Sequence, residues 1–306
     1  MTATDYPSAS VPSAAYGQEI ALSDFVALLK PRVMSLVVFT GAVGMALAPG
    51  ALHPVLALVA ILCIAVGAGA AGAINMWYDR DIDALMSRTK NRPIPAGRVA
   101  PSTALGFGVT LAVASVAIMA LAVNGMAAGL LAFTIFFYIV IYSMGLKRRT
   151  PQNIVIGGAA GAFPPMIGWA AVSGDITLAS TVLFAIIFLW TPPHFWALAL
   201  YKRSDYDKAG VPMLPVVAGR KTTAWQMLAY TVALLPVTLL PCVIGLSGMV
   251  YGAGASALGL LFLACAINVV RDQSERSARR MFPFSILYLF LIFVLLLVDQ
   301  SLWVAF

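Results

Sequence analysis

The sequence predicts an all-α polytopic membrane protein, a bundle of nine transmembrane helices, and three observations carry this prediction. Of the 306 residues, 61% are hydrophobic and only 10% are charged, which is far from the composition of a soluble domain. Apolar runs recur along the chain, each close to the ~20 residues that a helix needs to cross a bilayer. Finally, the basic residues fall only in alternate loops between those runs.

The apolar runs follow a polar segment at the amino terminus. Residues 1–29 carry Asp5, Glu19 and Asp24 but no Lys or Arg, so they lack the basic region of a signal peptide. We expect a disordered or surface-lying tail there, followed by one transmembrane domain over residues 30–306. The spans are expected at residues 33–50, 55–77, 103–122, 126–145, 152–172, 178–200, 223–245, 250–270 and 282–303.

The distribution of Lys and Arg tests the number of spans. With the amino terminus placed in the cytoplasm, all 19 Lys and Arg residues fall in inner loops, and the outer loops contain none. One miscounted span would invert every later loop, so this partition supports nine spans and a carboxyl terminus on the outer side. Because the net charge of +7 is divided among short loops, it predicts membrane topology and argues against nucleic-acid binding.

Two inner loops differ from the others because they combine acids with bases. The first continues from the second span, and its Asn75, Asp79 and Asp83 share one face if the helix continues through them. The second follows the sixth span and contains Asp205 and Asp207. One interpretation is that these acids only balance neighbouring arginines at the membrane surface, where ion pairs contribute little. The other interpretation is a site for a divalent cation.

A cation site accounts for both signs of charge. Mg²⁺ is usually bound by one or two carboxylates together with substrate phosphate oxygens. Asp79 and Asp83 facing Asp205 across the bundle would hold such ions, and basic side chains would contact the phosphate oxygens left free. The basic candidates are Arg88, Lys90, Arg92, Lys202 and Arg203. We therefore expect an active site that faces the cytoplasm and binds an anionic ligand through metal.

The motifs in these loops resemble those of a known family. Asn75-xxx-Asp79-xxx-Asp83 is similar to the first aspartate-rich motif of the intramembrane aromatic prenyltransferase superfamily, whose members have nine helices. Longer strings resemble its protohaem IX farnesyltransferase (haem O synthase) branch, and the similarity covers essentially residues 30–300. These strings are Tyr78–Asp83 with Met86–Pro93, Thr191–Trp196, and Asp205–Pro215.

The resemblance implies transfer of a farnesyl group from farnesyl diphosphate to a vinyl group of haem b, which gives haem O. Both substrates are lipid-soluble, so entry from the lipid bilayer is expected. The resemblance implies a bacterial plasma (inner) membrane location and a role in haem-copper oxidase biogenesis, with a haem A synthase as a partner that receives the product. Physical reasoning agrees, because Mg²⁺ with Arg and Lys would stabilise the departing diphosphate and a pocket among helices would exclude water.

The resemblance also implies roles for individual residues. Asp79, Asp83, Asp205 and Lys202 would be catalytic, and Asp207 would join the three aspartates as a metal ligand. The diphosphate would be bound by Asn75, Arg88, Lys90, Arg92, Lys202 and Arg203. One departure is that Lys202 aligns with a position where many superfamily members have aspartate. This difference predicts that one metal is held less firmly and that Lys202 contacts the diphosphate directly.

His194 is the second candidate region, in the sixth span about two helical turns before Lys202. Pro192 and Pro193 precede it and leave backbone carbonyls without helical partners. His194 could hydrogen-bond one of those carbonyls. Alternatively its imidazole could bind the haem iron, an interpretation that the resemblance favours.

Two other functions remain as alternatives. A prenyltransferase that uses a quinone precursor or another aromatic acceptor would need the same diphosphate site. A transporter of an anionic lipid or cofactor would also need intramembrane charges and proline-broken helices. However, a transporter predicts polar residues along a path to the far side, and the outer loops offer almost none.

Overall fold

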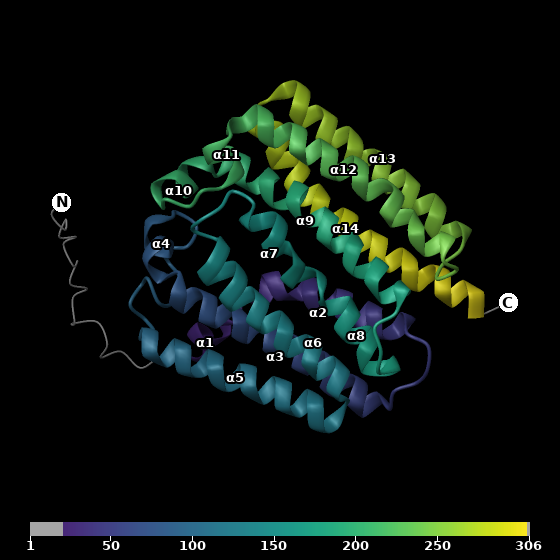
Figure 1. Cartoon of the computed structure of the whole chain (residues 1–306). Helices are drawn as coiled ribbons and strands as arrows, with labels where there is room; N and C mark the ends of the chain where they lie inside the picture. The colour runs from purple at the N-terminus through teal and green to yellow at the C-terminus, as the bar shows by residue number, and fades with distance from the viewer. Residues whose placement is uncertain (1–20, 305–306) are drawn as a thin grey trace.

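The computed structural model describes residues 21–304 and contains only helices and their connections within them (Figure 1). Most of the predicted disordered tail, residues 1–20, lies outside the described residues; its last part forms helix α1 instead. The helices are α1 (Leu22–Leu28), α2 (Pro31–Leu47), α3 (Pro54–Tyr78), α4 (Arg80–Leu85), α5 (Pro101–Ala122), α6 (Gly125–Phe136), the π-helix η2 (Phe137–Leu146), α7 (Asn153–Ala162), α8 (Pro164–Ser173), α9 (Leu178–Tyr201), α10 (Arg203–Lys208), α11 (Leu214–Val217), α12 (Gly219–Val243), α13 (Met249–Asp272) and α14 (Glu275–Val304).

Eight helical segments of the described chain are long and apolar enough to cross a bilayer. Two of these segments join consecutive helices: α6 with η2 over Gly125–Leu146, and α7 with α8 over Asn153–Ser173. The pair α1 and α2 passes the same test together, although the two helices meet at 54°. Counted as one bent span, this pair brings the number to nine, and the predicted all-α membrane fold is confirmed.

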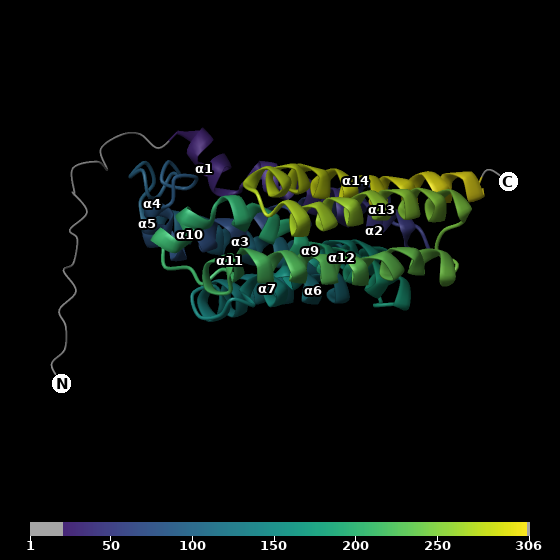
Figure 2. The same ribbon diagram turned by 90° about the horizontal axis from the view of Figure 1, so that it is seen from above.

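The spans pack around two apolar clusters (Figures 1 and 2). The first is formed mainly by α9, α12, α13 and α14, with Trp196, Phe262 and Tyr288 among its buried side chains. The second is formed by α2, α3, α5, α6 and α8. Helix α2 joins the two, because it packs against α3 and α8 and also against α14.

The contact between α2 and α8 depends on glycine. A Cβ atom on Gly44 of α2 would collide with the backbone of Pro165, and one on Gly168 of α8 would collide with the carbonyl oxygen of Gly41. In membranes, small residues at helix interfaces allow backbones to approach closely, and the resulting van der Waals contact stabilises the helix pair. These glycines therefore hold α2 in the middle of the bundle.

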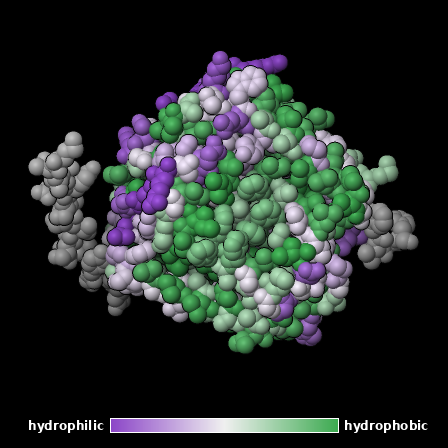
Figure 3. Space-filling model, viewed as in Figure 1, coloured by the Kyte–Doolittle hydropathy of each residue, from purple (hydrophilic) through white to green (hydrophobic). Residues whose placement is uncertain are grey.

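The polar connections gather at one end of the bundle. Helices α4, α10 and α11 all lie at that end, at the left of Figure 1. Hydrophilic side chains concentrate there, and apolar side chains cover most of the face between the two ends (Figure 3). Large apolar side chains such as Val113, Leu121 and Leu260 are exposed on the flanks, as expected for a surface that contacts lipid. The two mixed-charge loops thus share one end of the bundle.

Candidate active site

The first aspartate motif continues the second span almost without interruption. Helix α3 ends at Tyr78 and α4 begins at Arg80, and helical hydrogen bonds cross the junction. The Asp79 amide donates to Asn75 O at 2.9 Å, and the Asp83 amide donates to Asp79 O at 2.8 Å. The expected continuation of the helix is therefore present. Asn75, Asp79 and Asp83 are 4%, 0% and 2% exposed, so the row of polar side chains is buried.

Asp79 is held directly by Asn75 and Lys147, and Lys30 supports it through Asn75. Its Oδ2 accepts a 2.6 Å hydrogen bond from Asn75 Nδ2 and an ion-paired hydrogen bond from Lys147 Nζ. Asn75 in turn receives a 2.9 Å hydrogen bond on Oδ1 from Lys30, in the bend between α1 and α2. Lys30 adopts the left-handed backbone conformation, φ +52°, which turns the chain at this bend. These contacts compensate much of the cost of burying a carboxylate.

The π-helix η2 positions two of these groups. Ser143 Oγ accepts a 3.0 Å hydrogen bond from Asn75 Nδ2 and donates to Tyr138 O at 2.8 Å. The Lys147 amide donates to Tyr142 O at 2.8 Å, five residues earlier, as the π-helical pattern requires. The wider turn therefore places Ser143 beside Asn75, and Lys147 beside Asp79. π-Helical turns occur frequently at functional sites.

Asp81 and Asp83 have separate arginine partners. Asp83 Oδ2 accepts a 2.6 Å bond from Arg92, whose side chain is half-buried. Asp81 is exposed and receives two 2.7 Å bonds from Arg148. Partial burial acts to raise the pKa of Asp81, but hydrogen bonds from Arg148 and the backbone outweigh it and lower that pKa below its ordinary value. Asp81 is therefore a structural partner of Arg148, outside the buried row.

Arg148, in the loop after η2, links that loop to the aspartate motif. Its guanidinium lies 5.0 Å from the centre of the Tyr78 ring and donates to Tyr78 O at 3.2 Å. One of its nitrogens lies 3.6 Å from Asp79 Oδ1, too far for a hydrogen bond. That oxygen is buried and has no hydrogen-bond partner in the described chain. Asp79 thus keeps one acceptor oxygen free.

The second acidic loop contacts the segment that follows the first aspartate motif. Ser87 Oγ donates to Asp205 Oδ2 at 2.6 Å, which joins the segment after α4 to α10. Tyr206 is buried against Ile82 and Met86 in a small apolar cluster between the two loops. Burial raises the pKa of the Tyr206 hydroxyl, while the neighbouring Arg88 acts to lower it. The phenol is therefore protonated near neutral pH.

The predicted residues around the contact between the two loops differ in solvent exposure. Lys202 and Asp205 are half-buried, and Lys202 lies where α9 ends and α10 begins. The other predicted residues, Arg88, Lys90, Arg203 and Asp207, are exposed. Basic side chains therefore lie on both loops beside the buried aspartate row.

The carboxylates do not form a dense cage. Among residues 21–304, no three His, Cys, Asp or Glu side chains lie close enough together to hold a metal ion. Asp79 Oδ1 nevertheless fits a cation ligand, because it is a buried anionic oxygen that accepts no hydrogen bond and has only a 3.6 Å ionic contact with Arg148. Mg²⁺ typically takes one or two carboxylates and completes its shell with water and phosphate oxygens. The site therefore fits Mg²⁺ bound together with a diphosphate better than Mg²⁺ bound alone.

His194 is buried between α9 and α14. Its ring stacks on Trp190 at 4.3 Å and on Phe282 at 4.8 Å, measured between ring centres. Its Nδ1 lies 2.6 Å from Ser285 Oγ. The alternative in which His194 binds a carbonyl freed by the prolines is wrong for this nitrogen, whose partner is a side chain of another helix.

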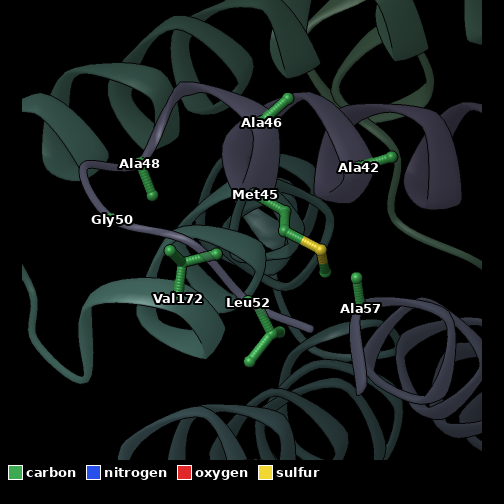
Figure 4. Close-up of a pocket in the computed structure, with 8 residues that line it drawn as sticks. All are labelled: Ala42, Met45, Ala46, Ala48, Gly50, Leu52, Ala57 and Val172. Carbon is green, nitrogen blue, oxygen red and sulfur yellow. The ribbon is translucent and has the colours of Figure 1, made fainter. Parts of the chain in front are cut away.

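An apolar hollow of about 290 Å³ lies at the opposite end of the bundle (Figure 4). Its lining residues are Ala42, Met45, Ala46, Ala48, Gly50, Leu52, Ala57 and Val172. These residues provide no charged or acid–base group. The hollow is therefore unsuited to bind a diphosphate, and the candidate site is the polar end of the bundle.

Comparison with known proteins agrees with this placement. The model of the UbiA prenyltransferase family matches residues 37–297, which include both acidic loops and every predicted site residue. The chain belongs to the UbiA prenyltransferase family. Its assignment to the intramembrane prenyltransferases by resemblance is confirmed.

Curated relatives of this UbiA prenyltransferase share a name. The chain is 62% identical to the protoheme IX farnesyltransferase of Parvibaculum lavamentivorans over 91% of this chain and 89% of the relative. It is 61% identical to the protoheme IX farnesyltransferase of Rhizobium johnstonii over 92% of this chain and 90% of the relative. The expected branch of the superfamily is thereby confirmed.

Solved structures show that this UbiA prenyltransferase shares the fold of more distant proteins. A digeranylgeranylglyceryl phosphate synthase has a TM-score of 0.76 at 17% identity, covering 91% of this chain and 98% of that chain. A UbiA homologue from Archaeoglobus fulgidus, bound to GPP and Mg²⁺, has a TM-score of 0.64 at 16% identity, covering 89% and 99%. At these identities the likeness concerns the fold.

Sequence reasoning missed four contributors to the site of this prenyltransferase. Lys30, Lys147 and Arg148 were expected only to set topology, and Ser143 was not considered. A signal was present for the basic residues: the loops near residues 30 and 147 are purely basic, whereas the buried aspartates need positive partners. Ser143 had no comparable signal, because its position depends on the π-helical turn.

Proposed function

We propose that this prenyltransferase transfers the farnesyl group of farnesyl diphosphate to a vinyl group of haem b, giving haem O. Prenyl transfer from a diphosphate is supported mainly by the buried row of Asn75, Asp79 and Asp83 with its cationic partners. The acceptor is supported by the shared name of relatives at about 60% identity over nine-tenths of the chain.

The metal ligands proposed are Asp79 and Asp83 on one loop and Asp205, with the exposed Asp207, on the other. When bound, Mg²⁺ would neutralise charge on the departing diphosphate. Binding at Asp79 would use the carboxylate oxygen that accepts no hydrogen bond. The Archaeoglobus fulgidus homologue was solved with GPP and Mg²⁺ bound, which supports the proposal that a prenyl diphosphate and Mg²⁺ bind together.

The basic residues would bind and stabilise the diphosphate. Arg92 and Lys202 are half-buried, whereas the other basic residues predicted to bind phosphate are exposed, and Lys147 adds a further cation beside Asp79. Positive charge placed where negative charge develops lowers the barrier for breaking the allylic carbon–oxygen bond. The full predicted set is Asn75, Arg88, Lys90, Arg92, Lys202 and Arg203.

The bond changes balance without a protein nucleophile. The carbon–oxygen bond of farnesyl diphosphate breaks, and the electron pair leaves with the diphosphate. The terminal vinyl carbon of haem b forms a bond to the allylic carbon, and the remaining cation on the porphyrin side chain takes up water and loses a proton. The products are haem O, diphosphate and a proton. The chain's part is to hold both substrates and exclude bulk water from the cation.

His194 is proposed to bind the haem iron. Both faces of its ring are covered by Trp190 and Phe282, and Nδ1 faces Ser285, so Nε2 is the nitrogen available to an external ligand. An imidazole held in this way is a suitable axial ligand for haem iron. His194 lies about two helical turns before Lys202 along α9, and therefore farther from the polar end of the bundle. This spacing would separate the porphyrin from the diphosphate.

The proposed cellular setting rests on charge and on the family resemblance. All Lys and Arg residues lie in alternate loops, which supports a cytoplasmic amino terminus and an outer carboxyl terminus. The bacterial inner membrane is proposed from the resemblance. A haem A synthase is the proposed recipient of the product. The candidate site would then open toward the cytoplasm.

One experiment tests the reaction. The purified full chain in detergent is incubated with haem b, farnesyl diphosphate and Mg²⁺, and the porphyrin is analysed by mass spectrometry. We expect one farnesyl group and one hydroxyl group added across a vinyl group of haem b, and no product when Mg²⁺ is chelated. A matched reaction with a hydroxybenzoate acceptor should give no prenylated product; prenylation of that acid and not of haem would overturn the proposal.

A further inference from the structure

We propose that Ser285 is a positioning residue that selects the tautomer of His194, so that Nε2 presents its lone pair to the haem iron. This inference rests on the proposed ligand role of His194. It concerns a hydroxyl on α14 that lies outside all three family-like motifs and is completely buried.

Four residues, His194, Trp190, Phe282 and Ser285, form a closed arrangement. His194 lies between the indole of Trp190, with 16° between the ring planes, and the ring of Phe282, with 19°. Trp190 Nε1 donates a 2.8 Å hydrogen bond to the backbone carbonyl of Ser285. Ser285 Oγ lies 2.6 Å from His194 Nδ1. The same residue therefore holds both the imidazole and one of the rings stacked on it.

The proton count decides the direction of the His194 hydrogen bond. Ser285 Oγ also lies 2.6 Å from the carbonyl oxygen of Phe282, which is only an acceptor. The single hydroxyl proton of Ser285 is therefore donated to Phe282 O. Satisfying the second contact requires His194 Nδ1 to carry a proton and donate it to Ser285 Oγ.

A neutral imidazole protonated at Nδ1 has its lone pair on Nε2. This nitrogen has no hydrogen bond to the described chain, and stacking on both faces leaves the ring edge as the only approach. Hydrogen bonding at one ring nitrogen commonly fixes which nitrogen binds a metal. Ser285 would thus prepare the ligand before haem arrives.

The tautomer is measurable in the wild-type ring without haem. The chain contains only two histidines, His53 and His194, so a His53→Gln protein labelled with ¹⁵N-histidine has one imidazole to assign. In the full-length protein in detergent, we expect the NMR spectrum to show the proton on Nδ1. A proton on Nε2 would overturn the inference.

Haem binding provides a second measurement that does not depend on turnover. Ferric haem b is titrated into the wild type and into Ser285→Ala, Ser285→Thr and His194→Ala, without farnesyl diphosphate. Loss of the Ser285 hydroxyl should weaken haem binding by about 10 to 100-fold, the usual effect of removing a partner of a metal-bound histidine. The absorption and EPR spectra should also shift, and Ser285→Thr, which keeps a hydroxyl, should restore much of both.

The outcomes separate this inference from the proposed function. If His194→Ala leaves the spectra and affinity of bound haem unchanged, the ligand role fails and the role of Ser285 fails with it. If His194→Ala changes them but Ser285→Ala behaves as the wild type, only the role of Ser285 is overturned. If Ser285→Ala does not fold, the NMR measurement on the His53→Gln protein decides.

Discussion

Asp79 is the most deeply buried carboxylate of the candidate site. The residue is 0% exposed, and its Oδ2 is held by Asn75 and Lys147 while Oδ1 has no hydrogen bond. Removing a carboxylate from water costs several kcal/mol unless partners compensate. Lys147 supplies the compensation on one oxygen. The other oxygen remains available to a cation that arrives with the substrate.

Replacing Asp79 tests whether its carboxylate binds the metal. Asp79→Asn preserves shape but removes the negative charge, so we expect Mg²⁺-dependent kcat/KM for farnesyl diphosphate to fall by about 100-fold or more. The matched control is Asp175→Asn, the same change at an exposed position far along the chain, with an effect within about twofold. Normal Mg²⁺-dependent turnover by folded Asp79→Asn protein would contradict the metal role.

Lys147 should contribute to stability through the same pair. Lys147→Met leaves the Asp79 carboxylate buried with its nearest cation removed, which typically costs about 3 to 5 kcal/mol. The free energy of unfolding in mixed detergent measures this loss. Lys208→Met, an exposed lysine on α10, is the control and should change it by less than about 0.5 kcal/mol.

A double substitution identifies the cause of that loss. In Lys147→Met/Asp79→Asn the buried charge is gone with its partner, so most of the lost stability should return while activity stays low. If the double variant is as unstable as the sum of the two single variants, the two side chains are not energetically coupled.

At the level of elements, the candidate active site lies where helices end. The α3–α4 junction, the end of η2 and the α9–α10 junction each place polar groups just beyond an apolar span. The contact between Ser87 and Asp205 ties the first and second acidic loops together, although they are 118 residues apart. Short helices that continue the long ones therefore extend the rigid bundle into the site.

The α2–α8 contact determines how closely the central helices approach. Gly168→Ala would force a methyl group against the carbonyl oxygen of Gly41, and we expect a loss of about 1 to 3 kcal/mol or more. Thermal unfolding of the purified protein measures it. Gly161→Ala on α7 is the matched control, because no atom lies within 4 Å of the added methyl group. That variant should be neutral or stabilised by up to about 1 kcal/mol, and equal losses in both variants would argue against close packing as the cause.

At the scale of the whole molecule, the charge partition predicts which loops face the cytoplasm. In a variant whose native cysteines Cys63, Cys242 and Cys265 are replaced by alanine, single cysteines are introduced at the exposed positions Asp175 and Lys208. A membrane-impermeant maleimide should label Asp175→Cys through the outer face of the inner membrane. It should label Lys208→Cys only from the cytoplasmic side. The reverse pattern would contradict the orientation, and labelling of both from one side would contradict the number of spans between them.

The spans, their alternation and the location of the two acidic loops were predictable from sequence. Each depends on local properties: apolar length against bilayer thickness, the placement of Lys and Arg, and the four-residue spacing from Asn75 to Asp83. The motif strings also predicted the family, which the match over residues 37–297 confirms. These features need no knowledge of which helices are neighbours.

Only the tertiary structure decided which charges pair and which nitrogen of His194 is occupied. Lys30 meets Asn75 across 45 residues, Lys147 meets Asp79 across 68, and His194 meets Ser285 across 91. Such pairs are set by helix packing and by the wider turn of η2, and no local periodicity encodes them. In a bundle with so few charged residues, the cost of burying a charge in an apolar medium makes these distant partners decisive.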